Sequence, residues 1–313
     1  MTPAFTFPGQ GSQAVGMGRS LYEAYPAAKA VFDEVDDALD EKLSATIFSG
    51  TEASLRLTAN AQPALMAVSL AAVRALETEG VDVSRAAVVA GHSLGEYSAL
   101  AAAGALSVGE AARLLRLRGN AMQTAVPEGE GAMAALLGLD LEAAEAVASE
   151  AAGDSVCDVA NDNAPGQVVV SGALAAVERA IHLAKDRGAK RALLLPVSAP
   201  FHCALMAPAA DAMAEALDSS ALAAPTVPLV ANVSTAKLTD PGAIRRSLVE
   251  QVTGRVRWRE SVVAMAGAGV DTLVEIGAGK VLSGLARRID RTLATVSINT
   301  AEDVTAYAER KAA

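Results

Sequence analysis

The 313-residue sequence predicts an α/β fold in which a smaller α+β subdomain is inserted into the main part of the chain. Short apolar runs alternate with longer Ala-rich stretches of helical periodicity, a pattern typical of α/β proteins. Between about 126 and 197 the order becomes β-α-β-β-α-β, which is the ferredoxin-like pattern. Hydrophobic residues make up 52% of the chain and charged residues 20%, so it can bury a sizeable core and global disorder is excluded.

The first part of the chain alternates strands with helices. The strands are brief apolar runs that end near Gly or Pro, and the helices are stretches whose apolar residues recur every three or four positions. In chain order we expect a strand at 5–7, helices at 19–39 and 63–76, a strand at 86–90, and helices at 95–103 and 108–122.

The middle of the chain carries the inserted pattern, after which the α/β rhythm resumes. We expect strands at 133–139, 156–160, 167–171 and 192–197, with helices at 141–151 and 174–187. Later strands are expected at 227–230, 272–276 and 295–298, and a helix at 280–289. We therefore assign 126–197 to a ferredoxin-like small subdomain, and 1–125 together with 198–313 to the α/β core.

The composition argues against several classes of partner. The net charge of −10 and the aromatic content of 3% give no footprint for nucleic acid. Two cysteines, Cys157 and Cys203, make neither a disulfide framework nor a zinc site, so no metal is expected. The chain has no signal-peptide pattern and no run of ~20 apolar residues, so we expect a cytoplasmic protein without membrane contact. Asn232-Val233-Ser234 matches a glycosylation acceptor and is interpreted as a chance match.

The strongest chemical signal is the motif Gly91-His92-Ser93-Leu94-Gly95, between an apolar strand and a helical stretch. A serine on such a sharp turn exposes its hydroxyl, as in a nucleophile elbow. Glycines flank it because the strand and helix backbones pass close together. The N–H of Leu94 lies at the start of the helix, where it can hold a developing oxyanion.

A serine nucleophile needs a base, and the chain has three histidines. His92 adjoins Ser93, where neighbouring side chains diverge, and is interpreted as a local hydrogen bonder. His182 lies within a predicted helix and has no special context. His202 follows a predicted strand on a loop, where catalytic residues are common, and is therefore the better candidate.

Other parts of a site are less clear from the residues alone. Asp154, Asp158 and Asp162 lie between the serine and the histidine in chain order, but nothing selects one as the acid of a triad. Arg118 lies near the end of a predicted helix, and the residue taken alone is more often a solvated helical arginine than a site residue. The Gly-rich segment 8–13 could bring N–H groups to an anion but matches neither a Walker A loop nor a Rossmann fingerprint.

Taken together, the motifs resemble the malonyl-CoA:acyl carrier protein transacylases, acyltransferases of fatty-acid and polyketide synthesis. The resemblance covers nearly the whole chain, in the family's order. The matching segments are Phe7-Pro8-Gly9-Gln10-Gly11-Ser12-Gln13, Gly91-His92-Ser93-Leu94-Gly95-Glu96-Tyr97, Leu117-Arg118-Gly119, Asn161-Asp162-Asn163-Ala164-Pro165-Gly166-Gln167, Phe201-His202-Cys203-Ala204-Leu205-Met206, and Glu275-Ile276-Gly277 with Gly279-Lys280-Val281-Leu282.

The resemblance implies a hydrolase-like parallel-sheet core and assigns roles to particular residues. Ser93 resembles the nucleophile that becomes malonylated and His202 the base. Arg118 resembles the residue that binds the malonyl carboxylate, and Phe201 before the histidine is similar to malonyl-selective members. The N–H groups of Gln10 and Leu94 resemble the oxyanion hole, and Gln251 resembles the residue whose main-chain carbonyl orients the histidine.

The implied reaction transfers malonyl from malonyl-CoA to the phosphopantetheine thiol of holo acyl carrier protein, through malonyl-Ser93, and supplies type II fatty-acid synthesis. No cofactor is expected, and we expect a monomer. Because carrier proteins are acidic, docking needs a local basic patch, for which Lys190-Arg191 and Arg287-Arg288 are candidates. The alternatives are the same chemistry for a polyketide synthase, a serine thioesterase, and a non-catalytic module that binds carrier protein.

Overall fold

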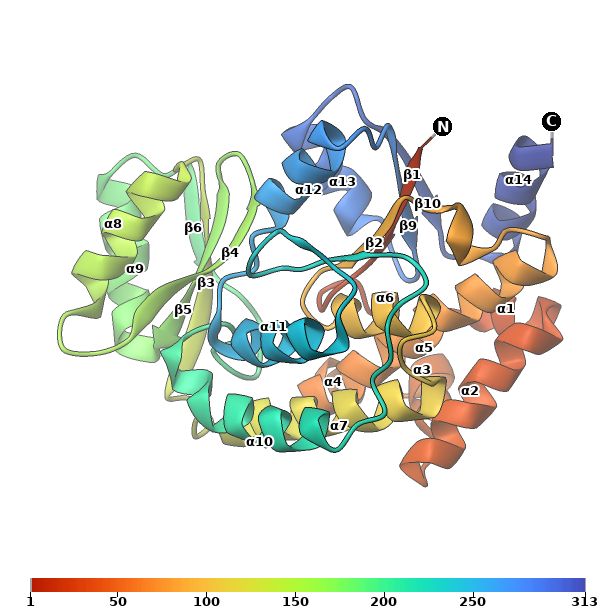
Figure 1. Cartoon of the computed structure of the whole chain (residues 1–313). Coiled ribbons are helices and arrows are strands. Elements are labelled where there is room, and N and C mark those ends of the chain that lie inside the picture. Colours follow the sequence, from red (N-terminus) through yellow and green to blue (C-terminus); the bar gives the residue numbers. More distant parts are fainter. Residues whose placement is uncertain (1, 313) are drawn as a thin grey trace.

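The computed structural model describes residues 2–312, which form two β-sheets with helices around them (Figure 1). The large sheet has the strand order β10-β9-β1-β2-β7-β8 and is parallel except for β8, which runs antiparallel to β7. Its strands are β1 (Pro3–Phe7), β2 (Val88–Gly91), β7 (Leu229–Val230), β8 (Lys237–Leu238), β9 (Thr272–Ile276) and β10 (Ala294–Ile298).

The helices supply most of the remaining structure. In chain order they are α1 (Arg19–Ala24), α2 (Pro26–Leu39), α3 (Leu43–Ser49), α4 (Glu52–Arg56), α5 (Thr58–Thr78), η1 (Val83–Arg85), α6 (Gly95–Ala102), α7 (Val108–Thr124), α8 (Leu141–Ala152), α9 (Leu174–Asp186), η2 (Ala204–Met206), α10 (Ala207–Asp218), α11 (Pro241–Thr253), α12 (Trp258–Gly267), α13 (Val281–Ile289) and α14 (Ala301–Ala312), where η marks a 3₁₀ turn.

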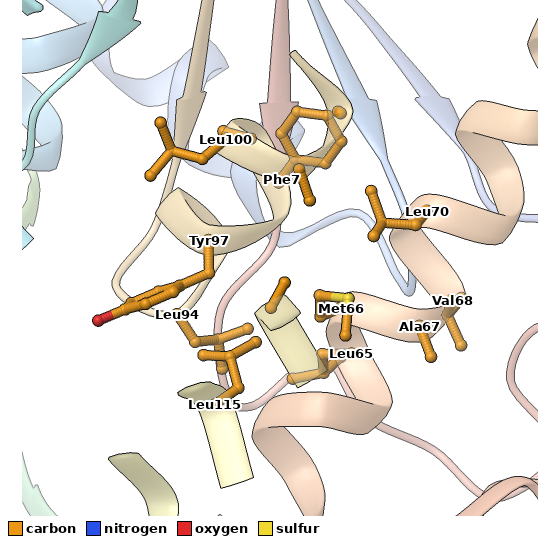
Figure 2. Close-up of a cluster of buried hydrophobic side chains, with 14 of the residues drawn as sticks. Phe7, Leu65, Met66, Ala67, Val68, Leu70, Leu94, Tyr97, Leu100 and Leu115 are labelled. Carbon is orange, nitrogen blue, oxygen red and sulfur yellow. The ribbon is translucent and has the colours of Figure 1, made fainter. Parts of the chain in front are cut away.

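The large sheet is covered on both faces, as parallel sheets generally are. Alternate residues of one strand face opposite sides, and in β1 Phe5 and Phe7 belong to one apolar cluster while Ala4 belongs to another. The first cluster includes α5, α6 and α7, and Figure 2 shows Phe7 of the sheet near Leu100 of α6, with Leu94 and Tyr97 in the same cluster. The second includes α12 and α13. The start of α6 therefore packs against the apolar residues of the first cluster, in which Leu94 and Tyr97 are buried.

The small sheet consists of β3 (Gly131–Leu137), β4 (Cys157–Ala164), β5 (Gln167–Ala173) and β6 (Arg191–Leu194). Its order is β4-β5-β3-β6 and all its pairs are antiparallel, which is the ferredoxin-like arrangement. Helices α8 and α9 cover its outer face, at the left of Figure 1, and share an apolar cluster with it. The predicted fold class is confirmed, while the division of the chain at 126 and 197 stays a prediction.

Several elements differ from the sequence prediction. The helix expected at 19–39 is two helices, because Tyr25 is extended (φ −123°, ψ 113°) before Pro26, and proline disfavours the helical conformation in the residue that precedes it. The helix expected at 63–76 begins earlier and ends later, at Thr58–Thr78, so that Pro63 lies inside it and not at its start. The strand expected at 192–197 ends at Leu194. The prediction missed α3, α4, α10, α11, α12, α14 and β8.

No helix within residues 2–312 is both long enough and apolar enough to cross a membrane.

Candidate active site

Ser93 lies at the turn between β2 and α6, in the strand–turn–helix context that the motif predicted. Its backbone is in the left-handed region (φ 54°), a conformation that non-glycine residues adopt at strained turns. A Cβ on Gly91 would overlap the backbone of Gly95, and a Cβ on Gly95 would overlap the Phe7 carbonyl. The two glycines are therefore required by close backbone contact.

Alanine at Gly91 should destabilise the protein by at least about 3 kcal/mol, since the overlap is with backbone that cannot rotate away. Chemical denaturation with circular dichroism measures the loss. Gly284→Ala is the matched control, because Gly284 is exposed within α13 and a Cβ there meets nothing within 4 Å. That control should stabilise by about 0.5–1 kcal/mol. An equal effect at both sites would contradict the close-contact explanation.

His202 lies within hydrogen-bond distance of Ser93. Its Nε2 is 2.7 Å from the Ser93 Oγ, and its Nδ1 is 2.8 Å from the main-chain oxygen of Gln251 on α11. A carbonyl oxygen only accepts, so Nδ1 carries the proton and Nε2 is free to accept from the serine hydroxyl. His202 is buried, with a left-handed backbone (φ 58°), on the loop between β6 and η2.

No carboxylate among the described residues contacts His202. Asp158 accepts from the N–H of Ala204, Asp162 pairs with Arg259, and Asp154 is exposed. The three aspartates that sequence order left open are therefore not the acid of a triad, and a main-chain carbonyl occupies that position.

Burial lowers the pKa of His202 to about 3, and the positive charge of Arg118 acts in the same direction. The imidazole is therefore neutral, and able to accept a proton, throughout the neutral range.

Acylation of Ser93 should consequently keep its rate as the pH falls from about 8 to about 5, and decline only toward the low pKa of His202. The measurement is kcat/KM for malonyl-CoA against pH. An inflection near 6.5, the ordinary pKa of histidine, would contradict this expectation.

The lowered pKa of His202 also makes the stability of the fold depend on pH. The unfolded chain takes up this proton first, so folding free energy is lost as pH falls below about 6.5.

Arg118, on α7, is 1% exposed and points toward the serine. Its Nη1 donates to Gln62 Oε1 (2.7 Å), and its Nη2 donates to Gln251 Oε1 (2.7 Å) and to Ser93 Oγ (3.1 Å). Among residues 2–312 it has no ion pair, and its Nε has no hydrogen-bond partner. A buried guanidinium held only by neutral groups is suited to bind a carboxylate.

A cavity of about 420 Å³ opens over Ser93, between the two sheets. The large sheet and its helices contribute Gln10, Leu94 and Arg118, and the small sheet contributes Met133 and Val169. Gln10 lies on the loop after β1, where its side-chain oxygen accepts from Thr58. The structure thus gathers all six predicted site residues at or beneath one cavity.

The structure also reveals neighbours that the sequence did not indicate. Asn232, on the loop after β7, accepts from the N–H of Ser93 (2.8 Å) and donates to the Gly91 carbonyl (2.7 Å), which secures the elbow. It is fully buried, so the glycosylation match has no accessible acceptor. Contacts that span 139 residues leave no local sequence signal. His92 has a hydrogen-bond partner, as predicted, but the partner is not local: its Nε2 is 2.8 Å from Oδ1 of Asn163 on β4.

A buried carboxyl group, that of Glu96, lies beneath the site. Glu96, in the first turn of α6, accepts from the N–H of Asn232 (2.8 Å) and from the side-chain amide of Gln251. Burial raises the pKa of Glu96 to about 8, while these two donors and Arg118 act in the opposite direction.

Among residues 2–312, no group of three or more His, Cys, Asp or Glu gathers to hold a metal ion.

The fold and this serine–histidine–arginine site define an acyltransferase. The pattern of the acyl transferase domain family matches residues 4–307, and the chain belongs to that family.

Its relatives are more specific. A malonyl CoA-acyl carrier protein transacylase of Bacillus subtilis is 48% identical over 302 residues, which cover 96% of this chain and 94% of the relative. The crystal structure of an acyl-carrier-protein S-malonyltransferase from Bartonella henselae is 56% identical, with a TM-score of 0.97 and full coverage of both chains. A second structure contains a malonyl-transacylase in complex with its type II polyketide-synthase acyl-carrier protein. It is 44% identical with a TM-score of 0.96, covering 99% of this chain and 100% of that one.

Proposed function

We propose that the chain transfers a malonyl group from malonyl-CoA to the phosphopantetheine thiol of acyl carrier protein, through a malonyl ester on Ser93. The observation that carries this function is the buried Arg118, whose Nη2 is 3.1 Å from the Ser93 Oγ and which has no ion pair among the described residues. A neutral acyl group would leave that cation unpaired, whereas malonyl presents a carboxylate to it.

The first half-reaction loads the enzyme. His202 Nε2 takes the proton as the Ser93 Oγ attacks the thioester carbonyl and a new C–O bond forms. The oxyanion is held by the N–H groups of Gln10 and Leu94, and such donors each contribute about 10²–10³ in rate. The C–S bond then breaks, and the leaving sulfur takes the proton from His202 and departs as the CoA thiol.

The second half-reaction runs the same chemistry in reverse order. The carrier thiol gives its proton to His202 and its sulfur attacks the malonyl ester. The C–O bond breaks and His202 returns the proton to Ser93. The Nδ1–H bond to the Gln251 carbonyl keeps the imidazole in the required tautomer through both halves.

Arg118 supports malonyl transfer over hydrolysis of neutral esters. Its planar fork matches a carboxylate, and a charged hydrogen bond contributes roughly 1.5–3 kcal/mol, which is about 10–150-fold in selectivity. A thioesterase for neutral acyl groups has no use for this cation.

Carrier protein docks on a basic surface made of Lys190, Arg191 and Arg288. Arg191 and Gln167 pair with Leu137 from opposite sides, and Arg288 donates to the side chain of Gln167 (3.0 Å). One member of each basic pair singled out in the sequence, Arg191 and Arg288, therefore lies at the same end of the small sheet, whereas Arg287 donates to Thr295 on β10. Arg191 lies four residues, about 13 Å, from Leu195 at the cavity.

The double variant Arg191→Glu/Arg288→Glu should raise KM for acidic carrier protein about 3- to 10-fold, because each exposed charge pair contributes about 0.2–1 kcal/mol. Steady-state kinetics measures KM for each substrate, and that for malonyl-CoA should stay the same. Arg310→Glu, on α14 at the opposite side of the molecule, is the control (Figure 1). Equal rises in both KM values would contradict docking here.

The proposal extends to the location, oligomeric state, cofactor requirement and pathway of the enzyme. The enzyme works in the cytoplasm as a monomer, without cofactor or metal, and supplies type II fatty-acid synthesis. The second candidate function is transfer of malonyl to the carrier protein of a polyketide synthase, since one similar structure is a malonyl-transacylase in complex with a type II polyketide-synthase carrier protein.

Intact-mass measurement after incubation with malonyl-CoA tests the function directly. Wild type should gain one malonyl group and lose it to added holo carrier protein, and Ser93→Ala should gain none. Free CoA without any adduct would instead indicate a thioesterase. Neither adduct nor CoA would indicate a binding module.

A further inference from the structure

The Glu96 carboxyl group is fully buried beneath the site and has no part in the proton transfers above. Its two oxygens face two donors, the main-chain N–H of Asn232 and the side-chain Nε2 of Gln251. Among the described residues neither oxygen has a hydrogen-bond acceptor beside it, so a carboxylic proton would have no partner there. Although burial raises the pKa of Glu96, a donor at each oxygen fits the ionised carboxyl group, which acts as a double acceptor within the core.

The Gln251 side chain connects this carboxyl group to the site. Its Nε2 donates to Glu96 and also to the main-chain oxygen of Ser93 (2.9 Å). Its Oε1 accepts from Nη2 of Arg118 (2.7 Å), the same nitrogen that approaches the serine hydroxyl. The orientation of one amide thus decides whether Arg118 meets an acceptor or a donor.

We propose that Glu96 is a positioning residue for malonyl selectivity, which acts by holding the Gln251 amide so that its oxygen faces Arg118. The inference rests on the proposed malonyl transfer and adds a residue to its specificity. It is separate from the base, because His202 is oriented by the main-chain oxygen of Gln251 and not by its side chain.

The variant Glu96→Gln keeps the shape of the side chain and replaces one acceptor with a donor. The main-chain N–H of Asn232 is fixed, so the new amide oxygen stays there and the new NH₂ group faces Gln251. Two donors then meet, and the Gln251 amide leaves its position: it either moves away from residue 96 or turns its nitrogen toward Arg118 and gives up its bond to the Ser93 main-chain oxygen. Arg118 loses an acceptor and its alignment with the malonyl carboxylate.

The experiment compares single-turnover loading of Ser93 by malonyl-CoA and by acetyl-CoA, followed by quenched intact mass. Glu96→Gln should lower kcat/KM for malonyl-CoA about 10- to 100-fold, mainly through KM, as expected for a misaligned charged hydrogen bond. Loading by acetyl-CoA, which does not use Arg118, should change less than about threefold. In an Arg118→Ala background the Glu96→Gln change should have no further effect on the malonyl-to-acetyl ratio.

Two further variants keep the test decisive. Gln251→Met removes the connecting amide but keeps the main-chain oxygen for His202, and should reproduce the selectivity loss even if Glu96→Gln folds poorly. Ser98→Ala, on the same helix, is the control, since the Ser98 hydroxyl is buried and has no hydrogen-bond partner.

Equal loss of malonyl and acetyl loading in folded Glu96→Gln would make Glu96 merely structural and overturn the inference. Unchanged selectivity in both Glu96→Gln and Gln251→Met would overturn it as well. If wild type itself takes no malonyl group, the proposed function fails instead, so the two failures are distinguishable.

Discussion

Replacement of His202 with alanine should slow malonylation of Ser93 by about 10²- to 10⁴-fold, the contribution of a well-placed general base. The loss follows from the 2.7 Å contact between Nε2 and the serine hydroxyl, since Arg118, the other side chain that contacts this hydroxyl among residues 2–312, can only donate. Rapid-quench intact mass gives the loading rate, and Tm shows whether the variant is folded.

The control is His182→Ala, because His182 is exposed on α9 in the small subdomain and the proposed mechanism gives it no role. Its loading rate should equal that of wild type. A folded His202→Ala variant that loads within about tenfold of wild type would assign the proton transfer to another group.

Replacement of Arg118 with alanine should lower kcat/KM for malonyl-CoA by about 10–150-fold or more, while acetyl-CoA loading changes far less. Arg118→Lys should rescue little, because an ammonium lacks the planar fork that pairs with a carboxylate. The ratio of the two loading rates is the measurement.

Arg116→Ala is the matched control, two residues earlier on the same helix. Arg116 is directed to Glu41 and Asn60, away from the serine, so its loss should leave the ratio unchanged. An Arg118→Ala variant that keeps its preference for malonyl would remove the main support for the proposed substrate.

The sequence predicts those parts of the fold and site that depend on local patterns. The buried strands β2 and β9 are short apolar runs, and the elbow is a contiguous motif in which Ser93 can be identified by the backbone geometry it needs. Continuous apolar runs do not predict the helices α10 and α11, because charged residues separate their apolar positions. Helices α3 and α4 are too short, at seven and five residues, to show a period.

The partners of the site residues could not be predicted in this way. Asn232 and Gln62 approach Ser93 and Arg118 only after the chain has folded, across 139 and 56 residues. Gln251 came from the resemblance alone, since a main-chain carbonyl has no residue signature. The sequence selects no aspartate as the acid of a triad, and among the described residues the group beside His202 Nδ1 is the main-chain oxygen of Gln251.

The two sheets divide the cavity into a reactive floor and a replaceable roof. Ser93, His202 and Arg118 stand on or against the large sheet's side, whereas Met133, Val169 and Leu195 reach the cavity from the small sheet and the segment that follows it. These roof residues form none of the side-chain hydrogen bonds that hold the nucleophile, base and guanidinium. The side chains that form the roof and those that carry the proposed chemistry therefore lie in separate stretches of the chain, so substitutions that change the volume under the roof can leave the hydrogen bonds of Ser93, His202 and Arg118 intact.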